Sequence, residues 1–572
     1  MVQARIYGKL YRADPCFDKL ATMQDGDFKP ARLKPGTTAA DVGLTLLSAI
    51  LLIISFPDFN LWPIAWIALV PFLLVIARRP RPWRSFFLGW LFGSVFFYGS
   101  CYWLTYSMVH TGGLPSWVAY LLLLPGAVVV GVFPAAFALM LACALRRWGA
   151  VAMFLAPLLW PALEWSRLQA TGQLWNALGY SQAYHPLLIQ TARWGGVYAV
   201  GFLIVSVNVA LAFVLFRRRV SAVAISVPVI ALVGLALMAA TFRGKRGELI
   251  SVDDAAAIVI AIQPNVPMDL VKSTEDLKEL TARHYEMSEL ALRRLPDNGR
   301  PRLVIWPESP MNFTYGTDSL LRDNLAAFAK VNHTSILLNS QETAPNNGIY
   351  NSALLINEEG KLVAQYDKIR LLPFGEYVPL PRWFPGVGLI GAIVGDFSPG
   401  TDYRLMPVGQ IKAGVFICIE SAYPAIARKF TSEGADVLIN ISNDGYLGPT
   451  AVMRQHLANA IFRAVENGRP VLRVTNSGIT AFITSEGEIR DATQGFTPEV
   501  RTWTLGHREN SSRFYTKHGD LFVSICAGLS LVFFLLSFRS RPNNDSLRQV
   551  NYANNWRLND RDLINSGIKK RL

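Results

Sequence analysis

Long apolar runs without a charged side chain recur along the first half of the sequence. They occupy 42–56, 61–77, 85–107, 118–145, 150–163, 197–216 and 220–242, and one more run follows at 521–538. A helix needs about 20 residues, with a range of about 17–25, to cross the hydrocarbon core of a bilayer. The runs at 42–56 and 150–163 are short by this measure, and the others fit it better. The pattern predicts a polytopic α-helical membrane protein with about eight spans.

Basic residues lie after every second apolar run and indicate how the spans are oriented. The clusters are Arg78, Arg79, Arg81 and Arg84 after the second run, Arg146 and Arg147 after the fourth, Arg217, Arg218 and Arg219 after the sixth, and Arg539 and Arg541 after the eighth. Because Lys and Arg accumulate in cytoplasmic loops, this alternation predicts that both termini are cytoplasmic. A cluster after the seventh run, at 243–246, departs from the pattern. The segment between the seventh and eighth runs is then expected on the outer side of the membrane.

This exported segment, 247–517, has the composition of a soluble domain. Strands are predicted at 257–262, 303–305, 335–338, 352–356, 414–417, 437–441, 471–474 and 481–484, and helices at 273–294, 320–331 and 454–467. The mixture predicts a layered α/β domain. The chain then divides into a cytoplasmic N-terminal extension (1–41), a membrane domain of seven spans (42–246), the exported domain (247–517), a final span (518–541) and a polar cytoplasmic tail (542–572).

The composition agrees with a membrane protein and argues against several other classes. Hydrophobic residues make up 51% of the chain, charged residues only 17%, and the mean hydropathy is +0.27, whereas ordinary soluble proteins carry about 25% charged residues. Cytoplasmic loops and anionic lipid heads account for the net charge of +14, so no nucleic-acid partner is expected. The five cysteines form no CxxC pair and have no histidine at metal-binding spacing. Neither a disulfide framework nor a metal or other cofactor is therefore expected, and residues 1–41 contain no apolar core of signal-peptide type.

Two short sequences hold a charged side chain in a turn-rich setting. In IWPESP, at 305–310, a strand is expected to end, and two prolines stiffen the chain around Glu308. Glu308 is either a general base or a surface carboxylate in a proline turn. Lys368 ends the sequence YDK and precedes LPFGE at 372–376. It is either a fixed cation for a developing oxyanion or one half of a solvated ion pair.

A third sequence, GVFICIE at 414–420, runs an apolar strand into Cys418. Such a residue can be a nucleophile at a strand-to-helix elbow, although a cysteine buried at a strand end is common. No one of these sequences is decisive, but Glu308, Lys368 and Cys418 occur in that order in one α/β domain. Together they form a candidate catalytic triad. A His–Cys pair is disfavoured and stays open.

The order Glu–Lys–Cys resembles the constellation of the nitrilase superfamily, in which a carboxylate replaces the histidine of papain-like enzymes. The chain from about 42 to 538 also resembles the apolipoprotein N-acyltransferase family, which has eight spans and a nitrilase-like domain inserted before the last one. Further similar segments are GYSQ at 179–182, QPNVP at 263–267, SNDG at 442–445, GRP at 468–470 and TNSG at 475–478. The resemblance implies an αββα sandwich for the exported domain.

The resemblance also implies a ping-pong acyl transfer at the bacterial inner membrane, with the catalytic domain on the periplasmic side. Cys418 would attack a phospholipid ester to give a thioester acyl-enzyme, and the N-terminal amine of a diacylglyceryl-cysteine lipoprotein would then take the acyl chain. Glu308 would serve as general base and Lys368 as the oxyanion cation. The apolar segment 380–397 is expected to be either a mobile loop that dips toward lipid or an ordinary packed loop. A monomer is expected.

Residues around the triad follow from the same resemblance. Glu376 and Glu420 match supporting positions, and substrate contacts are expected from Tyr446 and Trp306. Two positions depart from the family pattern. Ile419 stands where an aromatic residue is expected directly after the nucleophile, and Tyr446 stands where Trp is expected. Either departure could change the acyl-donor preference or the rate.

Two other functions stay open on sequence alone. A membrane-tethered nitrilase-type amidase would use the same three residues and let water attack the thioester, although eight spans favour a lipid substrate. A non-enzymatic receptor or transporter is the second alternative. The spans carry almost no interior charge, with Glu164 near the end of the fifth as the nearest exception, whereas transport usually needs some. A receptor would work without Cys418.

Overall fold

A computed structural model describes residues 38–242, 256–268, 272–296, 298–345, 348–378, 397–506 and 513–539. The described residues from Leu44 onward belong to one compact unit. Three predicted features lie wholly or almost wholly outside the described residues: the N-terminal extension, the polar tail, and the apolar segment 380–397. The basic cluster at 243–246 lies outside them as well.

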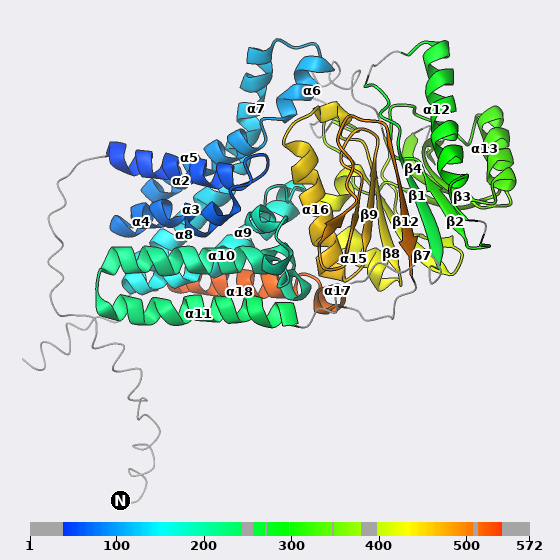
Figure 1. The fold of residues 1–572 in the computed structure, drawn as a ribbon. Coiled ribbons are helices and arrows are strands. Elements are labelled where there is room, and N and C mark those ends of the chain that lie inside the picture. The colour runs from blue at the N-terminus through cyan, green and yellow to red at the C-terminus, as the bar shows by residue number, and fades with distance from the viewer. Residues whose placement is uncertain are drawn as a thin grey trace, which may run out of the picture. The chain divides into compact units, whose positions relative to one another are not determined.

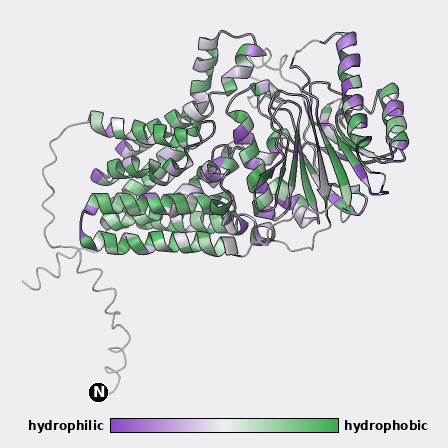
Figure 2. Ribbon diagram, in the orientation of Figure 1, coloured by the Kyte–Doolittle hydropathy of each residue, from purple (hydrophilic) through white to green (hydrophobic). Residues whose placement is uncertain are grey.

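Each of the eight apolar runs is occupied by helix (Figures 1 and 2). The α-helices are α2 (Thr38–Ser55), α3 (Ala65–Ala68), α4 (Val70–Arg78), α5 (Pro82–Ser100), α6 (Leu104–His110), α7 (Ser116–Val130), α8 (Val132–Trp148), α9 (Ala156–Thr171), α10 (Ala192–Arg217), α11 (Val220–Phe242) and, near the C-terminal end, α17 (Phe514–His518) and α18 (Leu521–Leu536). Gly149 ends α8 with φ 70° and Gly172 ends α9 with φ 67°. Both have a positive φ, which glycine adopts without strain.

The described helices confirm a polytopic α-helical part but not the count of eight spans. By length and composition three stretches can cross a membrane, namely Ser116–Thr171, Ala192–Arg217 and Val220–Ala240. A fourth is added if α5 and α6, bent by 52°, are taken as one span. The stretch Ser116–Thr171 is 56 residues long and contains two of the predicted runs, and the helices at 39–55, 62–78 and 521–536 are shorter. The count of eight stays a prediction.

The second part of the chain folds into two six-stranded sheets (Figure 1). The first has the order β12-β1-β2-β3-β4-β5 and the second the order β11-β10-β9-β8-β7-β6. The strands are β1 (Ala257–Gln263), β2 (Arg302–Ile305), β3 (Ser335–Thr343), β4 (Ile349–Ile356), β5 (Leu362–Asp367), β6 (Leu405–Val408), β7 (Ile411–Ile417), β8 (Val437–Ser442), β9 (Val471–Thr475), β10 (Ala481–Ile483), β11 (Ile489–Arg490) and β12 (Glu499–Leu505). Strands β1, β2 and β3 are parallel, as are β7, β8 and β9.

Helices cover the outer face of each sheet, which gives four layers. The helices are α12 (Thr274–Leu292), α13 (Ser319–Val331), α15 (Pro424–Ser432) and α16 (Val452–Asn467). One buried cluster joins side chains of the first sheet, such as Val304 and Leu338, to α12 and α13. Other side chains of the same sheet, such as Val259 and Ile305, share a core with the second sheet, α15 and α16. The predicted layered α/β domain is thus confirmed as an αββα sandwich.

All eight predicted strands and all three predicted helices of this domain are present, but α15 and four strands, β5, β6, β11 and β12, were not predicted. The sequence of β12, EVRTWTL, mixes polar and apolar residues without a regular period, and β5 is half-exposed at a sheet edge. Such strands lack the continuous apolar run of a buried parallel strand. The register of β12 is instead set by pairing with β1, from Ala257 opposite Leu505 to Gln263 opposite Glu499.

Helix α16 of the sandwich docks onto the apolar helices through Gln455. The Gln455 Oε1 atom accepts hydrogen bonds from Trp103 Nε1 at 3.0 Å and from Trp175 Nε1 at 2.8 Å. Its Nε2 atom donates to the carbonyl oxygens of Pro57 at 2.9 Å and Ser100 at 3.1 Å. One buried amide therefore satisfies four groups from three segments of the helical part.

We expect Gln455→Leu to lower the free energy of unfolding by about 2–4 kcal/mol, because buried donors and acceptors lose their partner. Trp103→Phe removes one of the four hydrogen bonds and should cost about 1 kcal/mol. Thermal unfolding of the detergent-purified protein measures both changes. An unchanged Tm in Gln455→Leu would show that this contact does not hold the two parts together.

Candidate active site

The ends of three strands bring the three predicted catalytic residues into one cluster. Glu308 follows β2 of the first sheet, Lys368 follows β5 of the same sheet, and Cys418 follows β7 of the second. The charges of Glu308 and Lys368 both act on the Cys418 thiol. Residues separated by 110 positions in the sequence therefore share one electrostatic environment.

Lys368 is the buried cation of the cluster, with 1% of its surface exposed. Its Nζ atom lies 2.8 Å from Glu376 Oε1 and 3.7 Å from Glu308 Oε1. A buried ammonium without such partners would be very unfavourable. Burial lowers the pKa of Lys368, but the two carboxylates outweigh it and hold that pKa above its usual range. Lys368 is thus a permanent positive charge at this site.

Glu308 is held by donors from both sheets. Its Oε1 atom accepts a hydrogen bond from Asn351 Nδ2 at 3.0 Å, and its Oε2 atom accepts one from the main-chain N–H of Asn443 at 3.1 Å. Asn351 also donates to Glu376 Oε1 at 2.7 Å, and its own Oδ1 is fixed by Asn339 Nδ2 at 2.7 Å. The Glu308 carboxylate is therefore set in a defined orientation rather than exposed in a proline turn.

Cys418 stands at a sharp bend between β7 and α15. Its φ is 52°, a left-handed conformation that non-glycine residues rarely adopt. The bend is organised by Glu420, whose carboxylate accepts from the main-chain N–H groups of Ile417 at 2.8 Å, Ile369 at 2.8 Å and Arg370 at 3.0 Å. Glu420 thereby ties the Cys418 turn to the segment that follows Lys368.

Burial and neighbouring charge determine how these groups ionise. Burial and the Glu308 carboxylate raise the pKa of the Cys418 thiol, whereas the Lys368 cation opposes them. Cys418 is therefore a neutral thiol at pH 7 and needs a base to become a nucleophile. Burial raises the pKa of Glu420 to about 7, against the hydrogen bonds from Ile417 and Arg370 that lower it.

The two residues expected to contact substrate lie in different places. Tyr446, in the short turn Gly445–Leu447, is 41% exposed, and burial together with the charges of Glu308 and Cys418 raises its pKa to about 12. Trp306 is fully buried and donates from Nε1 to Ser288 Oγ at 3.0 Å in the core beside α12. Trp306 packs in this core, and its expected contact with substrate stays a prediction.

Several residues of the site carried no predicted role. Asn443 lies in the SNDG segment, which stood out in the sequence without a chemical function. Asn351 directly precedes a predicted strand, and Asn440 lies inside one. His456, within the predicted helix 454–467, hydrogen-bonds the main-chain carbonyl oxygen of Cys418 from Nε2 at 3.0 Å.

Among the described residues, no three His, Cys, Asp or Glu side chains gather as a metal site.

Comparison with known proteins agrees with both halves of this architecture. Residues 48–210 match the apolipoprotein N-acyltransferase N-terminal domain, and residues 256–507 match the carbon-nitrogen hydrolase domain. The apolipoprotein N-acyltransferase of Geobacter metallireducens is 32% identical over 88% of this chain and 96% of its own. The chain belongs to the apolipoprotein N-acyltransferase family.

More distant relatives cover similar lengths. The apolipoprotein N-acyltransferase of Allorhizobium ampelinum is 31% identical over 71% of this chain and 76% of its own, and that of Chlorobaculum tepidum is 27% identical over 86% and 96%. The solved structure of Saccharomyces cerevisiae Nit3, a member of branch 10 of the nitrilase superfamily, aligns with 44% of this chain and 90% of its own at 18% identity, with a TM-score of 0.34. The curated relatives and the two matching domains identify the chain as an acyltransferase with a carbon-nitrogen hydrolase domain and membrane character.

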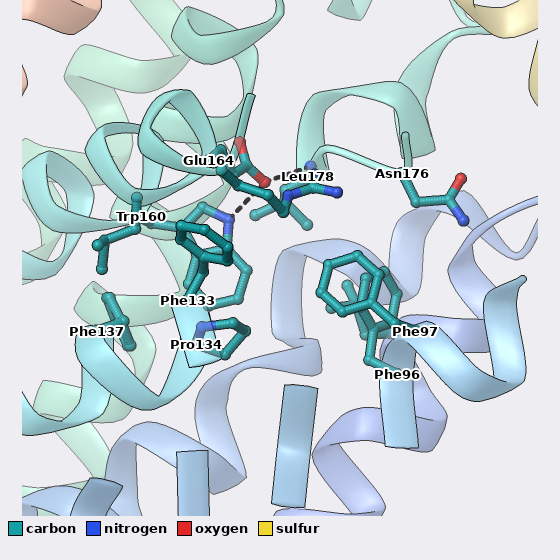
Figure 3. Close-up of a pocket in the computed structure, with 12 residues that line it drawn as sticks. Phe96, Phe97, Phe133, Pro134, Phe137, Trp160, Glu164, Asn176 and Leu178 are labelled. Carbon is teal, nitrogen blue, oxygen red and sulfur yellow. Dashed lines mark hydrogen bonds between the residues drawn. The ribbon is translucent and has the colours of Figure 1, made fainter. Parts of the chain in front are cut away.

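The helical part of the acyltransferase contains a separate small cavity of about 30 Å³ (Figure 3). Phe96, Phe97 and Phe137 line it together with Trp160 and Glu164. It has room for about two water molecules. Glu164 is buried here, and its Oε1 accepts from Trp160 Nε1 at 2.8 Å and from the N–H of Leu178 at 2.7 Å.

We expect Glu376→Gln to destabilise the acyltransferase by about 3 kcal/mol and to lower its activity, because Lys368 loses the nearer of its two carboxylates. The exposed ion pair between Lys429 and Glu433 provides a matched control. Glu433→Gln should cost less than about 0.5 kcal/mol. Thermal unfolding and acyl transfer are measured on both variants, and equal effects would contradict a special role for the buried pair.

Proposed function

We propose that Cys418 is the nucleophile of a two-step acyl transfer from a phospholipid to the N-terminal amine of a diacylglyceryl-cysteine lipoprotein. The observation that carries the proposal is the Cys418 thiol at a strained turn, within the field of the Glu308 carboxylate and the Lys368 ammonium. Family membership supplies the reaction class, and this cluster supplies a nucleophile, a base and a cation for it.

In the first step the Cys418 sulfur bonds to the ester carbonyl carbon while Glu308 takes the thiol proton. Lys368 stabilises the negative charge that develops on the carbonyl oxygen. The carbon–oxygen bond of the ester then breaks, and the proton passes from Glu308 to the departing oxygen of the lysophospholipid. The product is a thioester between the acyl chain and Cys418.

In the second step the lipoprotein amine attacks the thioester carbon. Glu308 accepts a proton from the amine, the carbon–sulfur bond breaks, and the Cys418 sulfur regains a proton. Glu376 and Asn351 orient Glu308 and Lys368 through the hydrogen bonds described above. Glu420 shapes the turn that presents Cys418, and partly exposed Tyr446 is positioned to contact substrate.

The membrane arrangement belongs to the same proposal. We place eight spans in the bacterial inner membrane, both termini in the cytoplasm, and the domain 247–517 on the periplasmic side between spans seven and eight. The alternating arginine clusters support this orientation. Donor and acceptor are both lipid-anchored, so a sandwich docked on the helices through Gln455 can meet both at the headgroup level. A monomer without a nucleic-acid partner stays the expectation.

Acyl-enzyme trapping tests the nucleophile. The purified protein is incubated with a phospholipid that carries a labelled acyl chain, without an acceptor. We expect label on the wild type that hydroxylamine removes, and no such label on Cys418→Ser. Overall transfer to a diacylated lipopeptide should fall on the order of 10³-fold or more in that variant.

A folded Cys418→Ser protein that still transfers the acyl chain normally would exclude the proposed nucleophile. Adding the lipopeptide to the labelled wild type distinguishes transfer from hydrolysis. Release of free fatty acid alone would favour the amidase-like alternative, in which water attacks the thioester.

Glu308→Gln should separate ionisation of the thiol from catalysis. Removing the Glu308 charge lowers the pKa of Cys418, since that carboxylate is one of the groups that raise it. We therefore expect alkylation of Cys418 by iodoacetamide at pH 8–9 to become faster, whereas acyl-enzyme formation becomes slower by about 10²–10⁴-fold because the base is lost. If a folded Glu308→Gln protein forms the acyl-enzyme at the wild-type rate, Glu308 does not act as the base of this mechanism.

A further inference from the structure

The main-chain carbonyl of Cys418 is held by two side chains that the proposed reaction does not use. It accepts a hydrogen bond from His456 Nε2 at 3.0 Å and another from Asn440 Nδ2 at 3.3 Å. Both donors are buried, His456 on α16 and Asn440 on β8. Cys418 itself is in the left-handed region, with φ 52°. A strained conformation of this kind persists only where the surrounding structure fixes it.

Further buried groups fix the His456 ring in turn. Its Nδ1 atom lies 3.0 Å from Arg473 Nη2 and 2.8 Å from Asp444 Oδ1. Arg473 also donates to Asp444 Oδ2 at 2.8 Å and to Asn440 Oδ1. Burial and the Arg473 cation lower the pKa of His456. The Nε2 atom carries a hydrogen that it donates to Cys418, because a carbonyl oxygen can only accept.

We infer that His456, together with Asn440, is a positioning residue that holds the Cys418 peptide in the conformation from which its sulfur reacts. This inference rests on the proposed role of Cys418 as nucleophile. A planar trans peptide points its C=O and the following N–H in opposite directions. Fixing the Cys418 carbonyl against His456 therefore also fixes the N–H of Ile419 on the opposite side.

The helix that supplies His456 also carries the docking contact with the apolar helices. Gln455, the preceding residue, accepts from Trp175 Nε1 at 2.8 Å, and the Trp175 ring lies 5.5 Å from the His456 ring. The turn at Cys418 is thus tied through two adjacent residues of α16 to the helical part of the protein. The arrangement places the nucleophile relative to both the sandwich and the helices.

Two substitutions of similar polarity test the inference. In His456→Gln the side-chain amide can reach the position of Nε2 and donate to the Cys418 carbonyl. In His456→Asn the amide is shorter and reaches only the position of Nδ1, next to Asp444 and Arg473. We expect the rate of acyl-enzyme formation at saturating labelled phospholipid to fall about 10- to 100-fold in His456→Asn, with KM little changed, and to recover most of the wild-type value in His456→Gln.

Asn459→Ala controls for disturbance of α16, because Asn459 is also buried on this helix and its Nδ2 has no hydrogen-bond partner among the described residues. It should keep the wild-type rate. If His456→Gln and His456→Asn slow the reaction equally while Tm falls equally, His456 serves stability alone and the inference is wrong. The inference also fails if His456→Asn keeps the wild-type rate. Cys418→Ser in the same assay reports separately on the nucleophile, since label retained there would overturn the proposed function instead.

Discussion

A lysine ammonium buried at the junction of two sheets is the constraint on which the site depends. Lys368 can be charged there only because Glu376 lies 2.8 Å away and Glu308 3.7 Å away, and both carboxylates share the Asn351 amide. Removing a charge from water is costly unless partners and hydrogen bonds replace it. The same partners therefore fix the position of Glu308, the proposed base, so that charge balance and the geometry of the site have one structural cause.

A second network of hydrogen bonds fixes the position of Cys418, the proposed nucleophile. Glu420 accepts three main-chain N–H groups around the Cys418 turn, and His456 with Asn440 holds the carbonyl from the other side. Two buried polar systems thus meet at Cys418, one centred on a cation and one on the Asp444–Arg473 pair. In each system most of the polar groups hydrogen-bond to one another. This restricts the number of conformations available to Cys418, which lies between them.

The helical part holds the sandwich in place and supplies none of the three proposed catalytic residues. Its small cavity is lined mainly by aromatic and aliphatic side chains and is separate from the Cys418 cluster. Its contact with the sandwich is specific instead: Gln455 satisfies groups from three different segments with one amide. A reaction between two lipid-anchored substrates gains from such a contact, because the reacting atoms can meet only at one depth.

The sequence by itself determined the broad class of the fold and the three central residues. Apolar runs reveal helices of a membrane protein because burial in lipid needs a long uncharged segment, and buried parallel strands show in the same way as short β-branched runs. Glu308, Lys368 and Cys418 were recognisable by order and local setting. Only the tertiary structure decided that Asn443, 135 positions away, orients Glu308, and that His456 hydrogen-bonds the main-chain carbonyl of Cys418. It also decided that Trp306 is buried in the core beside α12 and that β12 pairs with β1. These features depend on hydrogen bonds and packing between distant segments, and no local pattern of polarity records which distant partner a side chain will meet.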